Sequence, residues 1–155
     1  MSQSQVLAAP AGPLLDRVAR PLAPFAEPLV RATVGLFLVP HGAQKLFGWF
    51  GGYGLEATGQ FFAGKLGLPA SLALAAGVIE VFGGLALALG LGTRLAALLV
   101  AGLMFVAAFK VHLAAGFFWT AGGYEYPLMW GLVALAFVLQ GGGRYSLDAL
   151  LFRAR

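Results

Sequence analysis

The sequence predicts an all-α integral membrane protein, a four-helix bundle whose helices run up and down through the bilayer, with both chain termini in the cytoplasm. Of the 155 residues, 60% are hydrophobic and only 10% are charged, whereas soluble domains carry about 25% charged residues. The apolar residues form four stretches, each close to the roughly 20 residues that a helix needs to cross a bilayer. Basic residues lie at the ends of these stretches, as topology requires in membrane proteins.

The composition also narrows the chemistry. The net charge of +4 could suggest nucleic acid, but the position of the basic residues at span ends argues against that partner. The chain has no cysteine, which excludes thiol–disulfide chemistry, thiolate metal sites and iron–sulfur clusters held by this chain alone. With two histidines and no HExxH or Walker motif, we predict no metal site.

Residues 1–27 read as a cytoplasmic tail in which prolines break any long helix, although residues 14–20 could form a short interfacial turn. We expect no signal peptide, because no basic region precedes an apolar core with a cleavage site. The first span is predicted over residues 28–50, with a bend at Pro40. One face of it carries Arg31, Gly35, Leu38, His41, Gly42 and Lys45.

The second span, predicted over residues 70–91, has a single charge, Glu80, near its middle. At about 100° per residue, the Glu80 face is made of small residues: Ala73, Ala76, Gly77, Gly83 and Gly84. The opposite face is bulky and suits lipid: Val78, Phe82, Leu85 and Leu89. The small face allows a neighbouring helix to approach closely. An intramembrane acid is a functional candidate; the structural alternative is a protonated Glu80 that only hydrogen-bonds a neighbouring helix.

A glycine-rich aromatic loop joins the first two spans, and its segment GQFFAGKLGL could form a short helix. The third span is predicted over residues 95–118, with His112 facing the bundle and Lys110 reaching for the interface. The fourth, over residues 126–142, starts at Pro127, which suits a first helical turn. These spans make one domain over residues 28–143, and residues 144–155 form a basic cytoplasmic tail.

The orientation comes from the number of lysine and arginine residues toward each side of the membrane. One side carries seven: Arg17, Arg20, Arg31, Arg94, Arg144, Arg153 and Arg155. The other carries three: Lys45, Lys65 and Lys110. The count predicts both termini in the cytoplasm and the two aromatic loops on the outer side.

Six polar residues make a candidate site. From a rise of about 1.5 Å per residue, we expect His41 and Glu80 to meet deep in the bundle and to handle protons. Four ligand-binding candidates would form the mouth above them: Lys45, His112, Glu125 and Tyr126. Such a funnel would suit a proton path or hydrogen bonds to a quinone, and histidine changes charge near neutral pH. The structural alternative is a set of buried polar pairs that hold the helices in register. Haem ligation by His41 and His112, or copper at His112 and Met104, is weaker.

Four elements of the chain resemble the DoxX family of small bacterial membrane proteins. They are HGxxKxFG from His41, ExxGG from Glu80, HxxxGFF from His112 and GRYSLD from Gly143. The resemblance covers residues 31–151 and implies a four-helix inner-membrane protein. It further implies redox work, since relatives are linked to thiosulfate oxidation with quinone as acceptor and to membrane complexes that resist oxidative stress.

The leading hypothesis is therefore a component of a quinone-linked redox or oxidative-stress system in the bacterial inner membrane, with its polar site open to the periplasmic side. Quinone is the candidate ligand, and whether the protein is itself an enzyme stays open. Its partners would be the lipid bilayer and other membrane subunits or a second copy of the chain. Two alternatives remain: a non-catalytic accessory subunit of a respiratory or photosynthetic complex, and a small solute or ion transporter.

Overall fold

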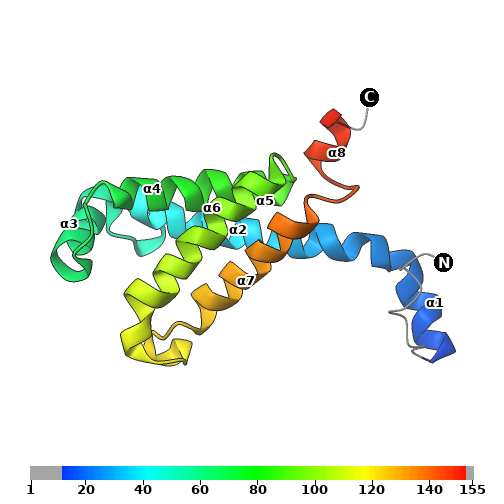
Figure 1. Ribbon diagram of the computed structural model, residues 1–155, viewed down its shortest axis with the longest axis horizontal. Coiled ribbons are helices and arrows are strands. Elements are labelled where there is room, and N and C mark those ends of the chain that lie inside the picture. Colours follow the sequence, from blue (N-terminus) through cyan, green and yellow to red (C-terminus); the bar gives the residue numbers. More distant parts are fainter. Residues whose placement is uncertain (1–11, 153–155) are drawn as a thin grey trace.

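The structure is a computed structural model that describes residues 12–152, and the secondary structure in that part of the chain is entirely helical. The all-α fold class is confirmed. Three helical runs are long and apolar enough to cross a membrane: Pro13–Phe47, Leu72–Leu89 and Thr93–Ala115. A fourth apolar helix, α7 (Glu125–Gln140), has 16 residues and is shorter than these. It lies beside the third run along the bundle (Figure 1). Three predicted tail residues, Pro10, Arg153 and Arg155, lie outside the described residues.

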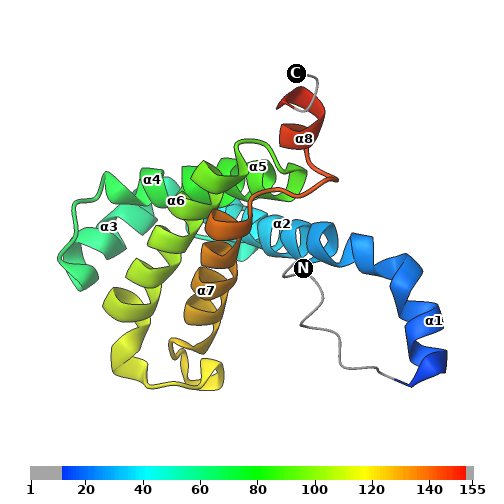
Figure 2. The same cartoon turned by 45° about the vertical axis from the view of Figure 1, so that its right-hand side comes forward.

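The first run is built from two helices with a short turn between them. Helix α1 (Pro13–Leu22) is followed by the 3₁₀ turn η2 (Ala23–Phe25) and then by α2 (Ala26–Phe47). Proline is tolerated in the first turn of a helix, where its missing N–H leaves no bond unmade, and Pro13 and Pro24 stand in such positions. Helix α1, which includes the predicted turn, points away from the bundle (Figures 1 and 2).

The second and third runs each contain a π-helical segment that hydropathy does not reveal. The second run consists of α4 (Leu72–Val78), the π segment η4 (Ile79–Gly83) and α5 (Gly84–Leu89). The third consists of α6 (Thr93–Val106), the π segment η5 (Ala107–His112) and the 3₁₀ turn η6 (Leu113–Ala115). Short π segments inside α-helices often mark functional positions. Here they contain two of the predicted site residues, Glu80 and His112.

Shorter helices close the two ends of the bundle. Helix α3 (Gly54–Leu66) forms in the loop between the first two runs and packs on α2 and α4. It includes most of the segment expected to be a short helix. The turns η3 (Trp49–Gly51) and η7 (Trp119–Ala121) lie in the aromatic loops. At the other end, the chain continues past α7 into α8 (Leu147–Phe152).

Two pairs of glycines bring α2 into close contact with the second run. A Cβ on Gly84 would lie 2.6 Å from the carbonyl oxygen of Gly35, and a Cβ on Gly35 would collide with the carbonyl oxygen of Gly84. One helical repeat further on, a Cβ on Gly42 would lie 2.7 Å from the carbonyl oxygen of Gly77. Small residues allow this backbone approach. The predicted close helix contact on the Glu80 face is therefore present.

The opposite face of the second run is exposed, as expected for a face that meets lipid. Its four bulky residues are each more than a third exposed: Val78, Phe82, Leu85 and Leu89. Leu87, on the Glu80 side, is fully buried and packs in a cluster with Val34, Ala97 and Phe137. The two faces of this run thus separate into a helix-packing side and a lipid side.

Candidate functional site

The centre of the candidate site is an ion pair between α2 and the π segment η4. Lys45 Nζ lies 2.8 Å from Oε1 and 2.7 Å from Oε2 of Glu80, so the ammonium group donates to both carboxylate oxygens. Glu80 is only 5% exposed, whereas the Lys45 side chain is 27% exposed. The pair therefore has a buried acid and a base that reaches the surface of the bundle.

The antiparallel arrangement of the two helices explains how the side chains meet. Helical side chains lean toward the N-terminus of their own helix. Lys45 stands near the C-terminus of α2 and leans back, which also brings Nζ to 3.4 Å from the His41 carbonyl oxygen. Glu80 leans the opposite way, toward the start of α4. The two side chains therefore lean toward each other, and their charged ends meet although their backbone positions differ in depth.

The predicted contact between His41 and Glu80 is wrong in this structure. Glu80 pairs with Lys45, and the His41 side chain stands on the exposed surface of α2. The helical wheel placed His41 and Lys45 on one face, but only residues at the centre of that face are buried, among them Leu38 and Gly42. His41 lies at the edge of the face and contributes its backbone carbonyl to Lys45.

The other three predicted residues flank the loop between η5 and α7: His112 ends η5, and Glu125 and Tyr126 begin α7. The Nδ1 atom of His112 lies 2.7 Å from the carbonyl oxygen of Gly122, so Nδ1 carries the proton in this bond. Glu125 accepts a hydrogen bond from the Trp119 amide at 3.1 Å through Oε2. The ring of Tyr126 stacks on that of Trp119, with centroids 5.3 Å apart. These contacts fold the loop onto itself.

The six candidates thus form two groups and an isolated residue. Lys45 and Glu80 make the ion pair; His112, Glu125 and Tyr126 organise the loop; His41 meets Lys45 through its backbone carbonyl alone. No hydrogen bond or ion pair within residues 12–152 joins the two groups. A hollow of about 490 Å³ between α3 and α4 and a second beside Gly92 and Asp148 are lined by none of the six. The predicted single funnel is not formed in this conformation.

A third polar cluster, at the opposite end of the bundle, was not predicted. Arg31 is 2% exposed and donates at 2.8 Å to the carbonyl oxygens of Leu87 and Ala88, both in the last turn of α5. It also donates to the Tyr145 carbonyl oxygen at 2.7 Å and to Glu27 at 2.9 Å. Arginine so placed satisfies carbonyls that a helix end leaves unpaired.

The same end holds a second tie, made by Asp148 of the GRYSLD element. Its Oδ1 accepts from the Gly92 amide at 2.7 Å, and its Oδ2 accepts from the amide and hydroxyl of Thr93 at 2.9 and 2.7 Å. Partial burial raises the pKa of Asp148, but the hydrogen bonds from Thr93 and Gly92 outweigh it and leave the pKa below its ordinary value. Asp148 therefore caps the first turn of α6 as a carboxylate. The sequence analysis missed this role of Asp148. The one signal for it was an acidic residue two positions after Ser146 in the GRYSLD element.

The fold and these polar pairs define an all-helical membrane protein with an ion pair buried between two of its helices. The sequence profile of the DoxX family matches residues 28–113, more than half of the chain. The protein belongs to the DoxX family.

Two relatives extend this similarity. A protein of Haemophilus influenzae named "Uncharacterized protein" is 35% identical over 133 residues, which cover 84% of this chain and 93% of the relative. A protein of Bacillus subtilis named "Putative oxidoreductase CatD" is 32% identical over 127 residues, which cover 82% of this chain and 87% of the relative. No solved structure matches the chain significantly.

Proposed function

We propose that the protein is a component of a quinone-linked redox system of the bacterial inner membrane, and that the Lys45–Glu80 pair receives the ligand. One observation carries the proposal: a carboxylate buried between two helices is paired with a lysine that keeps a quarter of its side chain exposed. A ligand in the membrane could therefore reach the ammonium group. The Bacillus subtilis relative, whose printed name is that of an oxidoreductase, supports the redox class.

The donor groups of the pair fit a quinone carbonyl. An ammonium group has three N–H donors, and here two point to Glu80 while the third meets only the distant His41 carbonyl oxygen at 3.4 Å. Lys45 can turn this third donor to a ligand oxygen without leaving Glu80. A bound quinone would supply the electron-accepting carbonyls, with electrons delivered by a redox partner. The chain's own part would be to bind and orient the ligand and to hold a proton at the Glu80 carboxylate.

The distribution of basic residues supports the proposed orientation. Arg31, Arg94 and Arg144 lie at the end where α1 and α8 leave the bundle, and Lys45 lies toward the opposite end. If the arginine-rich end faces the cytoplasm, the pair lies nearer the periplasmic side. We propose that the three long helical runs and α7 all cross the membrane, with the shorter α7 packed along α6.

The test is retention of quinone by the purified protein. Wild type, K45M, E80Q and the matched exposed control E56Q on α3 would be taken from the native membrane in mild detergent, with lipid extraction, native mass spectrometry and a visible spectrum. We expect quinone with wild type and E56Q, and at least a tenfold loss in K45M and E80Q if all variants elute as folded protein. Equal retention in all four, or none in wild type, would refute the site.

A second candidate is a non-catalytic subunit of a larger membrane complex. The observation that favours it is that every buried side-chain nitrogen or oxygen within residues 12–152 has a hydrogen-bond partner, so the polar pairs can serve packing alone. In that case the protein would co-purify stoichiometrically with other subunits and carry no quinone. The activity of the complex would then be unchanged in folded K45M and E80Q variants.

A further inference from the structure

Helix α1 has two chemically distinct faces, and it buries none of its residues. At about 100° per residue, its apolar residues fall on one arc and continue into the following turn: Leu14, Leu15, Val18, Leu22 and Phe25. All five are more than half exposed. The opposite arc carries Asp16, Arg17 and Arg20. The packing of the bundle leaves this apolar face uncovered.

The position of α1 limits what can cover that face. Only the three residues of η2 separate α1 from α2, the start of a run long enough to cross a membrane. The junction is held to the bundle, because the Phe25 ring stacks on Tyr145 with centroids 5.1 Å apart. Arg31 in turn binds the Tyr145 carbonyl oxygen. The C-terminal end of α1 is therefore held beside the bundle, close to the start of α2.

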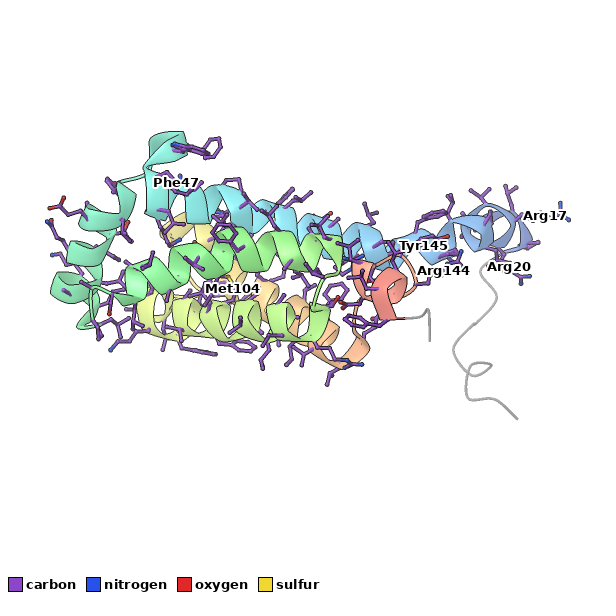
Figure 3. All side chains as sticks on the ribbon, turned by 90° about the horizontal axis from the view of Figure 1, so that it is seen from above. Arg17, Arg20, Phe47, Met104, Arg144 and Tyr145 are labelled. Carbon is purple, nitrogen blue, oxygen red and sulfur yellow. The ribbon has the colours of Figure 1, made fainter. Side chains whose placement is uncertain are left out.

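The charges around α1 are those that bind anionic lipid. Arg17 and Arg20 are exposed, and the Arg20 side chain is 82% exposed despite a 3.8 Å pairing with Asp16. Arg144 is exposed at the same end of the molecule, opposite the end marked by Phe47 (Figure 3). The short helix α8 also exposes Leu150, Leu151 and Phe152 at this end. Apolar and basic side chains together are typical of helices that lie in a membrane interface.

We propose that α1 lies on the surface of the leaflet at this end of the bundle, and that it binds anionic lipid headgroups. The apolar arc enters the boundary between headgroups and acyl chains, and Arg17 and Arg20 bind lipid phosphates. The α1–η2–α2 segment then acts as an anchor that fixes the depth of the bundle in the bilayer. This role is independent of the proposed quinone site.

The absence of cysteine in the chain makes a clean test available. Single cysteines at Val18, on the apolar arc, and at Asp16, on the polar arc, would carry nitroxide spin labels in the full-length protein. The protein would be reconstituted into vesicles of phosphatidylcholine with or without phosphatidylglycerol. Collision rates with oxygen, which partitions into lipid, and with a water-soluble nickel complex would report where each label lies.

In anionic vesicles we expect the V18C label to favour oxygen and the D16C label to favour nickel. The contrast should fall at least twofold in neutral vesicles and in an R17Q/R20Q background, since anionic headgroups supply part of the binding. Equal nickel access at both positions in anionic vesicles would overturn the proposal. So would spin–spin broadening at V18C that disappears on dilution with unlabelled protein, because a second copy of the chain would then cover the face.

Discussion

Lys45 and Glu80 are 35 residues apart in the chain, yet Nζ donates to both carboxylate oxygens within 2.8 Å. The pair joins α2 to the π segment of the second run across the close approach of Gly42 to Gly77. Each charged residue lies one turn after the glycine of its own helix, and because the two helices are antiparallel the side chains lean toward each other. The glycines bring the backbones together, and the ion pair bridges the same contact. Packing and chemistry are thus coupled, since a change at either glycine would move the carboxylate.

The first prediction concerns the strength of this pair. E80Q leaves the Lys45 ammonium without its carboxylate, and we expect a loss of about 1.5–3 kcal/mol in the free energy of unfolding. K45M leaves the buried carboxylate unpaired and should cost at least as much. The double variant K45M/E80Q should lose clearly less than the sum of the two single losses, because a neutral amide left without a partner costs less than an unpaired buried charge. Reversible unfolding in mixed detergent micelles measures all three.

The control for this cycle is K65M, at an exposed lysine in the last turn of α3. K65M should change the free energy of unfolding by no more than about 0.5 kcal/mol. If the effects of E80Q and K45M simply add in the double variant, the two groups are not coupled and the ion pair does not exist in solution. Failure of E80Q alone to fold would assign Glu80 a structural role.

The second prediction tests the glycine contact. G35A and G42A place a methyl group against the backbone of the second run, which cannot move aside, so each should cost about 1–3 kcal/mol. G77A should cost less, because its new methyl group meets the flexible end of Leu46. The measurement is again unfolding in mixed micelles.

Gly102 of α6 supplies the matched control, since a Cβ there has no neighbour within 4 Å. G102A should be neutral or stabilising by up to about 1 kcal/mol, because alanine favours the helix. Equal costs for G35A and G102A would show that backbone contact between α2 and α5 is not what makes glycine necessary.

The third prediction separates two arginines. R31M removes the Arg31 donors from the carbonyl oxygens of Ala88 and Tyr145 and one of the two donors of the Leu87 carbonyl oxygen. It also leaves Glu27 without its ion-pair partner, and we expect a loss of about 3–5 kcal/mol in the free energy of unfolding. R31K should not restore it, because an ammonium group lacks the planar fork that reaches partners on several sides. Arg94 donates to carbonyl oxygens in the last turn of α7 from an exposed position. R94M should therefore lower the free energy of unfolding by about 1 kcal/mol or less.

Comparable losses in R31M and R94M would contradict this burial argument. The comparison is informative because each arginine donates hydrogen bonds to carbonyl oxygens in the last turn of another helix. The two arginines differ mainly in exposure. Both variants should be measured in the same micelles, with circular dichroism to verify that helix content is kept before unfolding.

The sequence predicted the all-helical fold class because long apolar stretches leave little choice of structure. The predicted second span, residues 70–91, compares with the observed run Leu72–Leu89, and its lipid face is the expected one. The small-residue face of Glu80 also predicted the close helix approach. These features follow from side-chain size and hydrophobicity, which the sequence states directly.

The pairing of polar groups could not be predicted in the same way. Depth along a straight helix put His41, and not Lys45, beside Glu80, because it ignored the lean of side chains and the reach of lysine. The π segments change the local rotation of Glu80 and His112, and no composition signal marks them. In the sequence, Arg31 served only as one of the basic residues that predict the orientation in the membrane. In the structure its role depends on carbonyl groups more than 50 residues away.

The structure also gives a physical role to residues in each family element. Lys45 of HGxxKxFG and Glu80 of ExxGG make the ion pair. Gly42 of the first element and Gly84 of the second each make a close helix contact, with Gly77 and Gly35 respectively. His112 of HxxxGFF fixes the following loop. Asp148 of GRYSLD caps α6. All four elements therefore contain residues with a structural role. Two of them, HxxxGFF and GRYSLD, stabilise the loops and helix ends of the bundle.

The last prediction concerns pH and Asp148. Its pKa is lower in the folded protein than in the unfolded chain, so the carboxylate stabilises the fold above its ordinary pKa of about 3.9. That contribution disappears as the pH falls through the lower, folded value. At pH 7, D148N should lose about 0.5–1.5 kcal/mol, because both carboxylate oxygens accept hydrogen bonds and the amide keeps only one acceptor oxygen. The difference between wild type and D148N should shrink steadily below pH 4.

The control is D16N on α1, where the carboxylate meets Arg20 only at 3.8 Å on an exposed helix. Exposed pairs of this kind contribute little, so D16N should follow wild type within about 0.5 kcal/mol from pH 7 to pH 3. Because both variants remove one carboxylate, the change in net charge is the same. A D148N difference that stays constant from pH 7 to pH 3 would mean that the loop around Gly92 and Thr93 is held by shape, and that the charge of Asp148 contributes nothing to the cap.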